Sequence, residues 1–213
     1  MRRVTLSANF TANFRALIDA VIVLARGGIV AIPTDTLYAL AVDPLSSTAI
    51  ARLMAVKGRP TERAIALIGA DAEQVVRDLG ELPMMAQKLA STFWPGPLTL
   101  LVPRPASIPS ALTGGSPLVG VRVPNDDAAR ELCRFWGHVL TATSANLSGE
   151  PASDDPERVA RVFADRDVDL LLDGGNTCGG PPSTVVEAAG EEIRLVRAGA
   201  IPWDEVQQCA RPR

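Results

Sequence analysis

The stretch FRALIDAVIVLARGGIVAIPTDT, residues 14–36, decides the class of fold. Its first half repeats apolar residues at helical spacing, and Gly27-Gly28 is a typical stop after such a helix. Residues 29–32 then form a short apolar run that ends at Pro33, the pattern of a buried strand between breakers. A helix that leads into a strand within so few residues predicts an α/β layer.

The same pattern repeats along the rest of the chain. Five further helical segments follow typical helix-start residues, which are Ser46 or Ser47, Asp71 with Gln74, Pro83, Asn125 or Asp126, and Asp155-Pro156. Apolar runs predict additional strands at residues 64–68, 98–102, 118–123, 139–142, 168–172, 184–186 and 193–196. We therefore predict one α/β domain over residues 1–213, α+β by strict classification, in which a twisted mixed sheet of about seven strands carries helices on its faces.

Composition excludes several classes of protein. The chain has 213 residues with 47% hydrophobic content, enough for a substantial core, and no apolar run approaches the roughly 18 residues of a membrane span. The three cysteines, Cys133, Cys178 and Cys209, are too far apart for a disulfide framework or paired metal ligands. We therefore expect a cytoplasmic protein without a membrane partner. The net charge of −3 argues against a protein that binds nucleic acid over its whole surface, and it allows only a local basic cleft for such a ligand.

Two polar segments follow predicted strands, where the ligands of α/β sheets gather. The first, Pro33-Thr34-Asp35-Thr36, offers hydroxyls for a polar substrate, although taken alone an ordinary turn with local caps is the simpler explanation. The second, TATSANLSG at residues 141–149, offers hydroxyls, an amide and exposed N–H groups, which together can bind an anion. A turn rich in Ser and Asn is the alternative here.

Cationic residues supply complementary candidates. Lys57 and Arg59 stand two apart across a glycine and can converge on phosphate or carboxylate oxygens, or they simply complement a helix dipole at the surface. Arg122 and Arg197 lie in or at the end of predicted strands and have apolar neighbours. Such an arginine is costly to bury unless it meets an anion. The alternative is an edge-strand residue that points to solvent.

In their order and spacing these segments resemble the threonylcarbamoyl-AMP synthase family, also called YrdC-like. The mark of that family is a Lys-x-Arg followed far downstream by Ser-x-Asn, which Lys57-Gly58-Arg59 and Ser144-Ala145-Asn146 match. The similarity spans roughly residues 15–201. It also includes GIVAIPTDT at 28–36, FWPGPLT at 93–99, VRVP at 121–124, SANLSG at 144–149, STVV at 183–186 and RAGAI at 197–201.

The resemblance implies a YrdC-like fold and an L-threonylcarbamoyladenylate synthase, which makes threonylcarbamoyl-AMP and pyrophosphate from L-threonine, bicarbonate and ATP. It implies that the product serves the threonylcarbamoyladenosine modification of tRNA through downstream threonylcarbamoyl-transferase proteins. A tRNA or double-stranded RNA is a candidate direct partner. Mg²⁺ is expected with ATP, held mainly through phosphates and water, with no metal ligands from the protein.

The resemblance also implies roles for eight residues. Threonine or bicarbonate would be held by Thr36, Lys57, Arg122 and Ser183. ATP would be contacted by Arg59, Ser144, Asn146 and Arg197. Lys57 and Arg59 would form the catalytic pair, and we expect both to face the cleft, so that replacing either by alanine abolishes synthesis and leaves the fold intact. The single histidine, His138, starts a predicted strand and is interpreted as structural.

Several positions depart from the family pattern. Ala39-Leu40-Ala41 replaces the usual Gly-Leu-Gly, which predicts less clearance near the substrate. Ile68 stands where longer members have a threonine-binding histidine, Pro182 replaces an acidic residue, and Arg63 replaces a smaller polar one. These differences concern the threonine pocket more than the ATP site. The chain ends at Arg213 and resembles the short form of the family, which lacks a C-terminal domain.

Two other functions fit part of the pattern. A double-stranded RNA or tRNA-binding module would use the same basic cleft without catalysis, and its affinity would depend on salt and on Arg52, Lys57, Arg59 and Arg63. The carbamoyl-transfer domain of hydrogenase maturation proteins shares this fold family. Those proteins carry zinc-finger regions, whose cysteine spacing this chain lacks.

Overall fold

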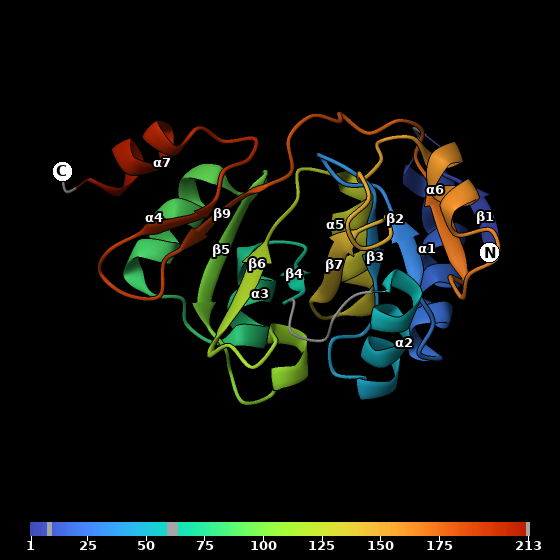
Figure 1. Ribbon diagram of the computed structural model, residues 1–213, viewed down its shortest axis with the longest axis horizontal. Coiled ribbons are helices and arrows are strands. Elements are labelled where there is room, and N and C mark those ends of the chain that lie inside the picture. Colours follow the sequence, from blue (N-terminus) through green and yellow to red (C-terminus); the bar gives the residue numbers. More distant parts are fainter. Residues whose placement is uncertain (8–9, 59–63, 212–213) are drawn as a thin grey trace.

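The computed structural model describes residues 1–7, 10–58 and 64–211, and within them ten strands form one mixed sheet (Figure 1). The order across the sheet is β1-β8-β2-β3-β7-β4-β6-β5-β9-β10. The strands are β1 (Arg2–Thr5), β2 (Val30–Ile32), β3 (Ala39–Ala41), β4 (Ala66–Ile68), β5 (Leu98–Pro103), β6 (Leu118–Arg122), β7 (Leu140–Ser144), β8 (Leu170–Asp173), β9 (Thr184–Glu187) and β10 (Arg194–Arg197). Parallel and antiparallel pairs alternate irregularly, so the sheet is mixed as predicted.

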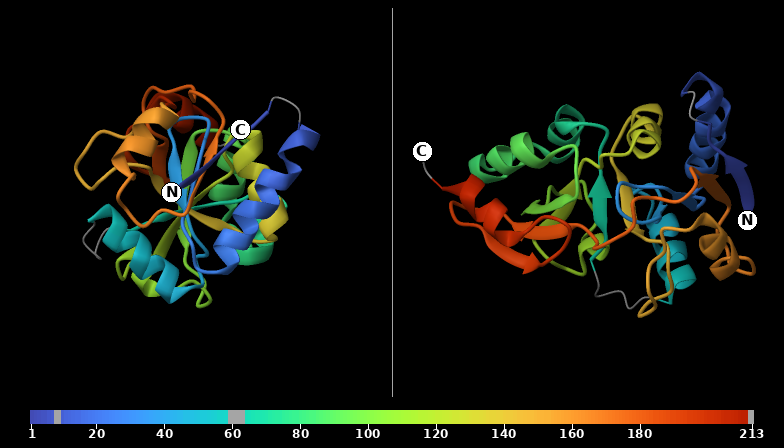
Figure 2. Two further views of the ribbon diagram at one scale, coloured as in Figure 1. Left: turned by 90° about the vertical axis from the view of Figure 1, so that its right-hand side faces the viewer. Right: turned by 90° about the horizontal axis from the view of Figure 1, so that it is seen from above.

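Helices cover the sheet on both sides. They are α1 (Phe10–Ala25), α2 (Ser47–Lys57), α3 (Ala72–Leu79), α4 (Met84–Phe93), α5 (Asp127–Trp136), α6 (Pro156–Val162) and α7 (Trp203–Ala210), with a 3₁₀ turn at Ser110–Thr113. Figure 2 shows α1 and α5 on one side of the sheet, and α2 and α6 on the other. The two chain ends lie at opposite ends of the molecule (Figure 1). No described helix combines the length and apolar character that crossing a membrane requires.

Local sequence signals account for the helix boundaries. The side chain of Ser46 accepts a hydrogen bond from the N–H of Ala49 at the start of α2, and Asp126 accepts one from Ala129 at the start of α5. Gly58 ends α2 in the left-handed conformation, with φ of 58°. Asp71 and Gln74, the predicted start of α3, form half of a capping box. The carboxylate of Asp71 accepts from the N–H of Gln74 at 2.9 Å, but the side-chain oxygen of Gln74 accepts from the N–H of Ala70 instead of that of Asp71.

The predicted number of strands, about seven, was wrong. The two strands without a predicted counterpart are β1, which is largely exposed, and β3, which consists of three small or apolar residues. Neither segment shows the alternation that signals a strand, because β1 is polar and β3 is too short. The C-terminal helix α7 was also not predicted. Strand β1 extends one edge of the sheet and β3 lies within it, and neither these strands nor α7 change the class of fold.

The helices leave part of one face of the sheet uncovered. On that face α1 and α5 bury Leu17 and Leu132 against Ile32 and Leu140, which belong to β2 and β7. Further along the same face, β4, β5 and β6 carry alternate residues that line a cavity instead, at positions 66 and 68, 99 and 101, and 120 and 122. Small residues such as Gly120 leave room there. The fold therefore provides a sheet surface as the floor of a site.

Candidate active site

One cavity of about 720 Å³ collects most of the residues predicted to bind substrate. Its lining includes six of the eight, namely Thr36, Arg122, Ser144, Asn146, Ser183 and Arg197. They come from the loop after β2, the ends of β6, β7 and β10, and the loop before β9. Segments far apart in the sequence therefore meet over the open sheet face. Of the other two, Lys57 lies behind the cavity wall, and Arg59 lies outside the described residues, as does Arg63.

Arg122 is the buried cation in the cavity floor, with only 7% of its surface exposed. Its Nη1 lies 3.0 Å from Oδ1 of Asp35, and its Nη2 donates to Oγ1 of Thr34 at 3.1 Å and to Oγ1 of Thr36 at 3.5 Å. Burial lowers the pKa of Arg122, and the charge of Asp35 opposes that effect. A guanidinium stays protonated in proteins, so the floor is cationic. Arg122 is thus no solvent-facing edge residue.

Lys57 corrects the expectation that this side chain faces the cleft. It is the last residue of α2 and is only 2% exposed. Its ammonium donates to the main-chain oxygen of Ser144 at 2.5 Å, to that of Asn146 at 2.9 Å, and to Oδ1 of Asn146 at 3.3 Å. These oxygens compensate for the hydrating water that the ammonium loses when it is buried. Lys57 therefore supports the loop that begins at Ser144 from behind.

The loop after β7 forms one wall of the cavity. Ser144 is exposed and donates through Oγ to Oδ1 of Asn146 at 2.5 Å. The side-chain amide of Asn146 donates in turn to the main-chain oxygen of Glu150, and the N–H of Ala145 donates to the carbonyl of Tyr38 at 2.8 Å. Asn146 thus braces the loop and also lines the cavity. The loop presents hydroxyl and amide groups held in place from several directions.

The opposite wall joins β9 and β10. Nη2 of Arg197 donates to the main-chain oxygen of Ser183 at 2.6 Å and to its Oγ at 3.1 Å. Oγ of Ser183 also lies 2.9 Å from Oγ1 of Thr99, a residue of the cavity lining with no predicted role. Among the departures from the family pattern, Ala39, Ile68 and Pro182 line the cavity, and Ala41 is buried in β3. This wall therefore combines one cation with two hydroxyls.

A glycine-rich segment after β8 holds the Thr36 loop. Oγ1 of Thr177 and the N–H of Gly179 both donate to the main-chain oxygen of Thr36, at 2.7 and 2.9 Å. The segment is itself anchored by Tyr38, whose hydroxyl donates to the carbonyl of Gly175 at 2.7 Å and accepts from the N–H of Gly174 at 3.1 Å. Tyr38 is fully buried, and burial raises its pKa to about 12.

Replacing Tyr38 by phenylalanine is expected to lower the free energy of unfolding by about 1–2 kcal/mol, because the change removes the two hydrogen bonds that its hydroxyl forms with the carbonyl of Gly175 and the N–H of Gly174. Urea unfolding at constant pH measures this difference. Turnover is expected to fall only in part, since the ring still fills its site. Equal unfolding midpoints for the two proteins would mean that water or the segment itself replaces the hydroxyl.

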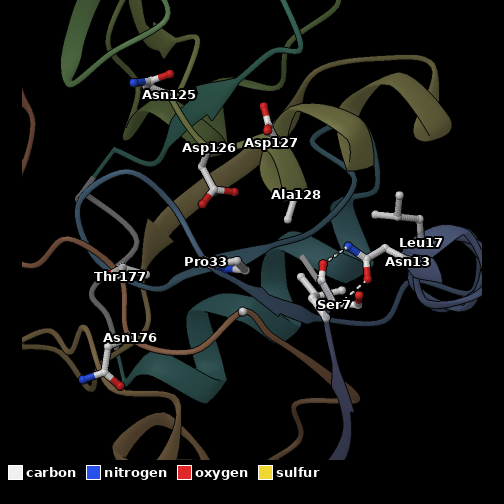
Figure 3. Close-up of a pocket in the computed structure, with 12 residues that line it drawn as sticks. Ser7, Asn13, Leu17, Pro33, Asn125, Asp126, Asp127, Ala128, Asn176 and Thr177 are labelled. Atoms are coloured by element: carbon white, nitrogen blue, oxygen red, sulfur yellow. Dashed lines mark hydrogen bonds between the residues drawn. The ribbon is translucent and has the colours of Figure 1, made fainter. Parts of the chain in front are cut away.

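A second cavity of about 520 Å³ shares the loop after β2 (Figure 3). Pro33 lines it, together with Asn125, Asp126 and Asp127 at the start of α5. Burial raises the pKa of Asp126, and the N–H of Ala129 that its carboxylate accepts opposes this. Carboxylates and amides line this cavity, and no Lys or Arg is among its described lining residues. It is therefore unsuited to a triphosphate, and the first cavity is the candidate site.

Two further observations bear on the alternatives. Arg52 contacts Asp167 and lies 3.0 Å from Asp169, so its charge is already paired within the fold. Together with the burial of Lys57, this removes two of the four cations that a double-stranded RNA site would need. His138 lies on the surface with Nδ1 3.2 Å from Asp78, outside the cavity lining, in agreement with a structural role.

Comparisons with known proteins agree with this architecture. The Sua5_yciO_yrdC family model, described as telomere recombination, matches residues 22–199. A threonylcarbamoyl-AMP synthase of Pyrococcus abyssi is 35% identical over 87% of this chain, and one of Vibrio cholerae is 34% identical over 88%. A crystal structure of P. abyssi Sua5 complexed with L-threonine superimposes with a TM-score of 0.89 at 33% identity over 98% of this chain.

The relatives differ in length. This chain covers 54% of the P. abyssi synthase and 60% of the chain in its threonine complex, but 97% of the V. cholerae protein. It thus spans about half of the longer relative and nearly all of the shorter one. The family match over most of the sequence and the similarity of the fold lead to one conclusion: the chain belongs to the Sua5/YciO/YrdC family.

Proposed function

We propose that this chain is an L-threonylcarbamoyladenylate synthase, which forms threonylcarbamoyl-AMP and pyrophosphate from L-threonine, bicarbonate and ATP. The observation that carries the proposal is the single cavity in which the cationic floor at Arg122 faces the walls at Ser144 and Arg197. It can hold an amino acid beside a nucleotide. Relatives that align with most of this chain, at 34–35% identity, are threonylcarbamoyl-AMP synthases, and the P. abyssi Sua5 structure contains L-threonine.

The chemistry suits such a cavity. The carbamate that threonine forms with bicarbonate is a weak nucleophile, and one of its oxygens must attack the α-phosphorus of ATP as the bond to pyrophosphate breaks. Several negative charges approach one another in that step, so cations and fixed N–H and O–H donors supply most of the help. We assign Thr36, Arg122 and Ser183 to threonine and its carbamate. We assign Ser144, Asn146, Arg197 and, outside the described residues, Arg59 to ATP.

Mg²⁺ is part of this proposal as the companion of ATP. In the described part of the chain, no group of three or more His, Cys, Asp or Glu residues could hold a metal ion. Among the described lining residues of the cavity, Glu150 is the one carboxylate, and Arg122 and Arg197 are the cations. That donor set fits a cation bound by phosphates and water and brought in with the nucleotide. Bound there, Mg²⁺ would neutralise phosphate charge.

The product must be passed on, because a mixed anhydride of a carbamate and a phosphate hydrolyses readily in water. We propose that downstream threonylcarbamoyl-transferase proteins use it to modify adenosine in tRNA, in the cytoplasm. The alternative is a non-catalytic module that binds tRNA or double-stranded RNA in the same cleft; the relatives' names do not favour it, and a salt-dependent affinity without ATP turnover would be its signature.

Release of pyrophosphate from ATP tests the function. The purified chain with Mg²⁺ is expected to release pyrophosphate only when L-threonine and bicarbonate are both present, and threonylcarbamoyl-AMP is expected as the matching product by mass spectrometry. Omission of either substrate is the control. Binding of double-stranded RNA without any threonine-dependent pyrophosphate would contradict the proposal and favour the binding module.

Arg197 offers a matched test of the nucleotide end. Arg197→Ala is expected to raise the KM for ATP about tenfold, because it removes a charge-assisted contact that faces the cavity. Arg194→Ala is the control, since Arg194 lies on the same strand and pairs with Glu187 outside the cavity lining. Steady-state kinetics on both variants decide the matter. Equal KM values for the two would assign the nucleotide to another wall.

A further inference from the structure

We propose that Asp35 is a positioning residue for substrate binding: it fixes the guanidinium of Arg122 so that this group presents N–H donors to the carboxylate of L-threonine or to its carbamate. The inference rests on the proposed function, because it names the substrate group that Arg122 receives. Asp35 itself is absent from the cavity lining and therefore acts through Arg122.

The contact between the two side chains is buried and electrostatic. Side-chain exposure is 9% for Arg122 and 7% for Asp35, and Nη1 lies 3.0 Å from Oδ1. Neither carboxylate oxygen of Asp35, nor Nη1 of Arg122, forms a hydrogen bond with the described residues. Charge attraction in a medium of low polarity is therefore the main force that holds the pair together.

The neighbours of Asp35 define the orientation of the guanidinium. Thr34 and Thr36 flank Asp35 in sequence, and both hydroxyls lie within reach of Nη2, at 3.1 and 3.5 Å. Oγ1 of Thr34 is held in turn, because it donates to the main-chain oxygen of Leu37 at 2.7 Å. Three consecutive residues thus grip Arg122 on two of its nitrogens. A guanidinium has five N–H donors, more than these contacts use, so an anion in the cavity can share the group.

A purely structural purpose does not explain the pair well. Buried ion pairs contribute little net stability compared with apolar residues of similar size, because both ions lose their hydration. If two apolar residues took the place of Asp35 and Arg122, the floor of the cavity would lose its positive charge. Its presence at the cavity floor is explained if a fixed cation is needed there, since a freely moving arginine would first have to be ordered by the substrate.

Asp35→Asn provides the test. The variant keeps the size of the side chain and removes its charge, so Arg122 is held less firmly. The KM for L-threonine is expected to rise about tenfold, with the KM for ATP changed less than about twofold, because only the threonine end loses its preset geometry. Asp35→Glu, which restores the charge, is expected to recover part of the loss.

The control is Asp71→Asn, which changes the N-cap carboxylate of α3 outside the cavity lining and affects stability without altering either KM. Unchanged threonine KM in Asp35→Asn would overturn the inference, and so would an equal rise in both KM values, since that indicates a general structural effect. Binding of L-threonine is also followed by its effect on the melting temperature, without turnover. If the unmodified protein releases no pyrophosphate yet its threonine-dependent melting shift is lost in Asp35→Asn, the proposed function fails and the positioning role stands.

Discussion

Replacing Lys57 by methionine is expected to abolish pyrophosphate release and to lower the free energy of unfolding by about 3 kcal/mol. The ammonium of Lys57 is buried and donates to two main-chain oxygens and one side-chain oxygen in the loop of Ser144 to Asn146. Methionine keeps the length of the side chain but leaves these acceptors unpaired away from water. The loop that forms one wall of the candidate active site then loses its support.

This expectation differs from the sequence-based one, in which a lysine facing the cleft could be removed without harm to the fold. Lys88→Met is the matched control. Lys88 on α4 also donates to two main-chain oxygens, those of Ala210 and Arg211, at 3.4 and 2.6 Å, but outside the cavity lining. Its replacement is expected to leave turnover unchanged. A Lys57→Met protein with normal unfolding but no turnover would show that the ammonium acts on substrate instead of on the loop.

Replacing Arg122 by leucine is expected to destabilise the protein by about 3–5 kcal/mol, because Asp35 is left buried without its ion-pair partner. It is also expected to remove turnover, because the cavity floor loses its cation. The double variant Asp35→Asn/Arg122→Leu is expected to regain much of the stability, since no unpaired charge remains. It should not regain turnover, because the cationic floor is absent. Chemical unfolding and pyrophosphate release, measured on the single and double variants, separate the two effects.

Equal free energies of unfolding for Arg122→Leu and the double variant would contradict this explanation, since an unpaired Asp35 carboxylate would then not destabilise the protein. Activity in the double variant would contradict the role of Arg122 at the threonine end. The pair therefore allows stability and substrate binding to be measured separately at one place in the structure.

Helices, most strands and their order in the chain were predictable because their signals are local. The N-cap at Ser46 and the left-handed Gly58 each depend on neighbours within one helical turn, and both appear in the sequence at the expected spacing. Strands β1 and β3 were not predicted, because a polar edge strand and a three-residue strand carry little local signal. Six of the residues that line the cavity were identified by family resemblance, and their gathering in one place agrees with it.

The sequence by itself determined the class of fold, the family and most residues of the candidate site, because these follow from local periodicity and from motifs in a set order. Only the tertiary structure decided which way the side chains face. It turned Lys57 inward beneath a loop 87 residues away, and it paired Arg122 with Asp35. Burial and charge pairing depend on segments that are distant along the chain, and neither composition nor spacing encodes which of them will meet.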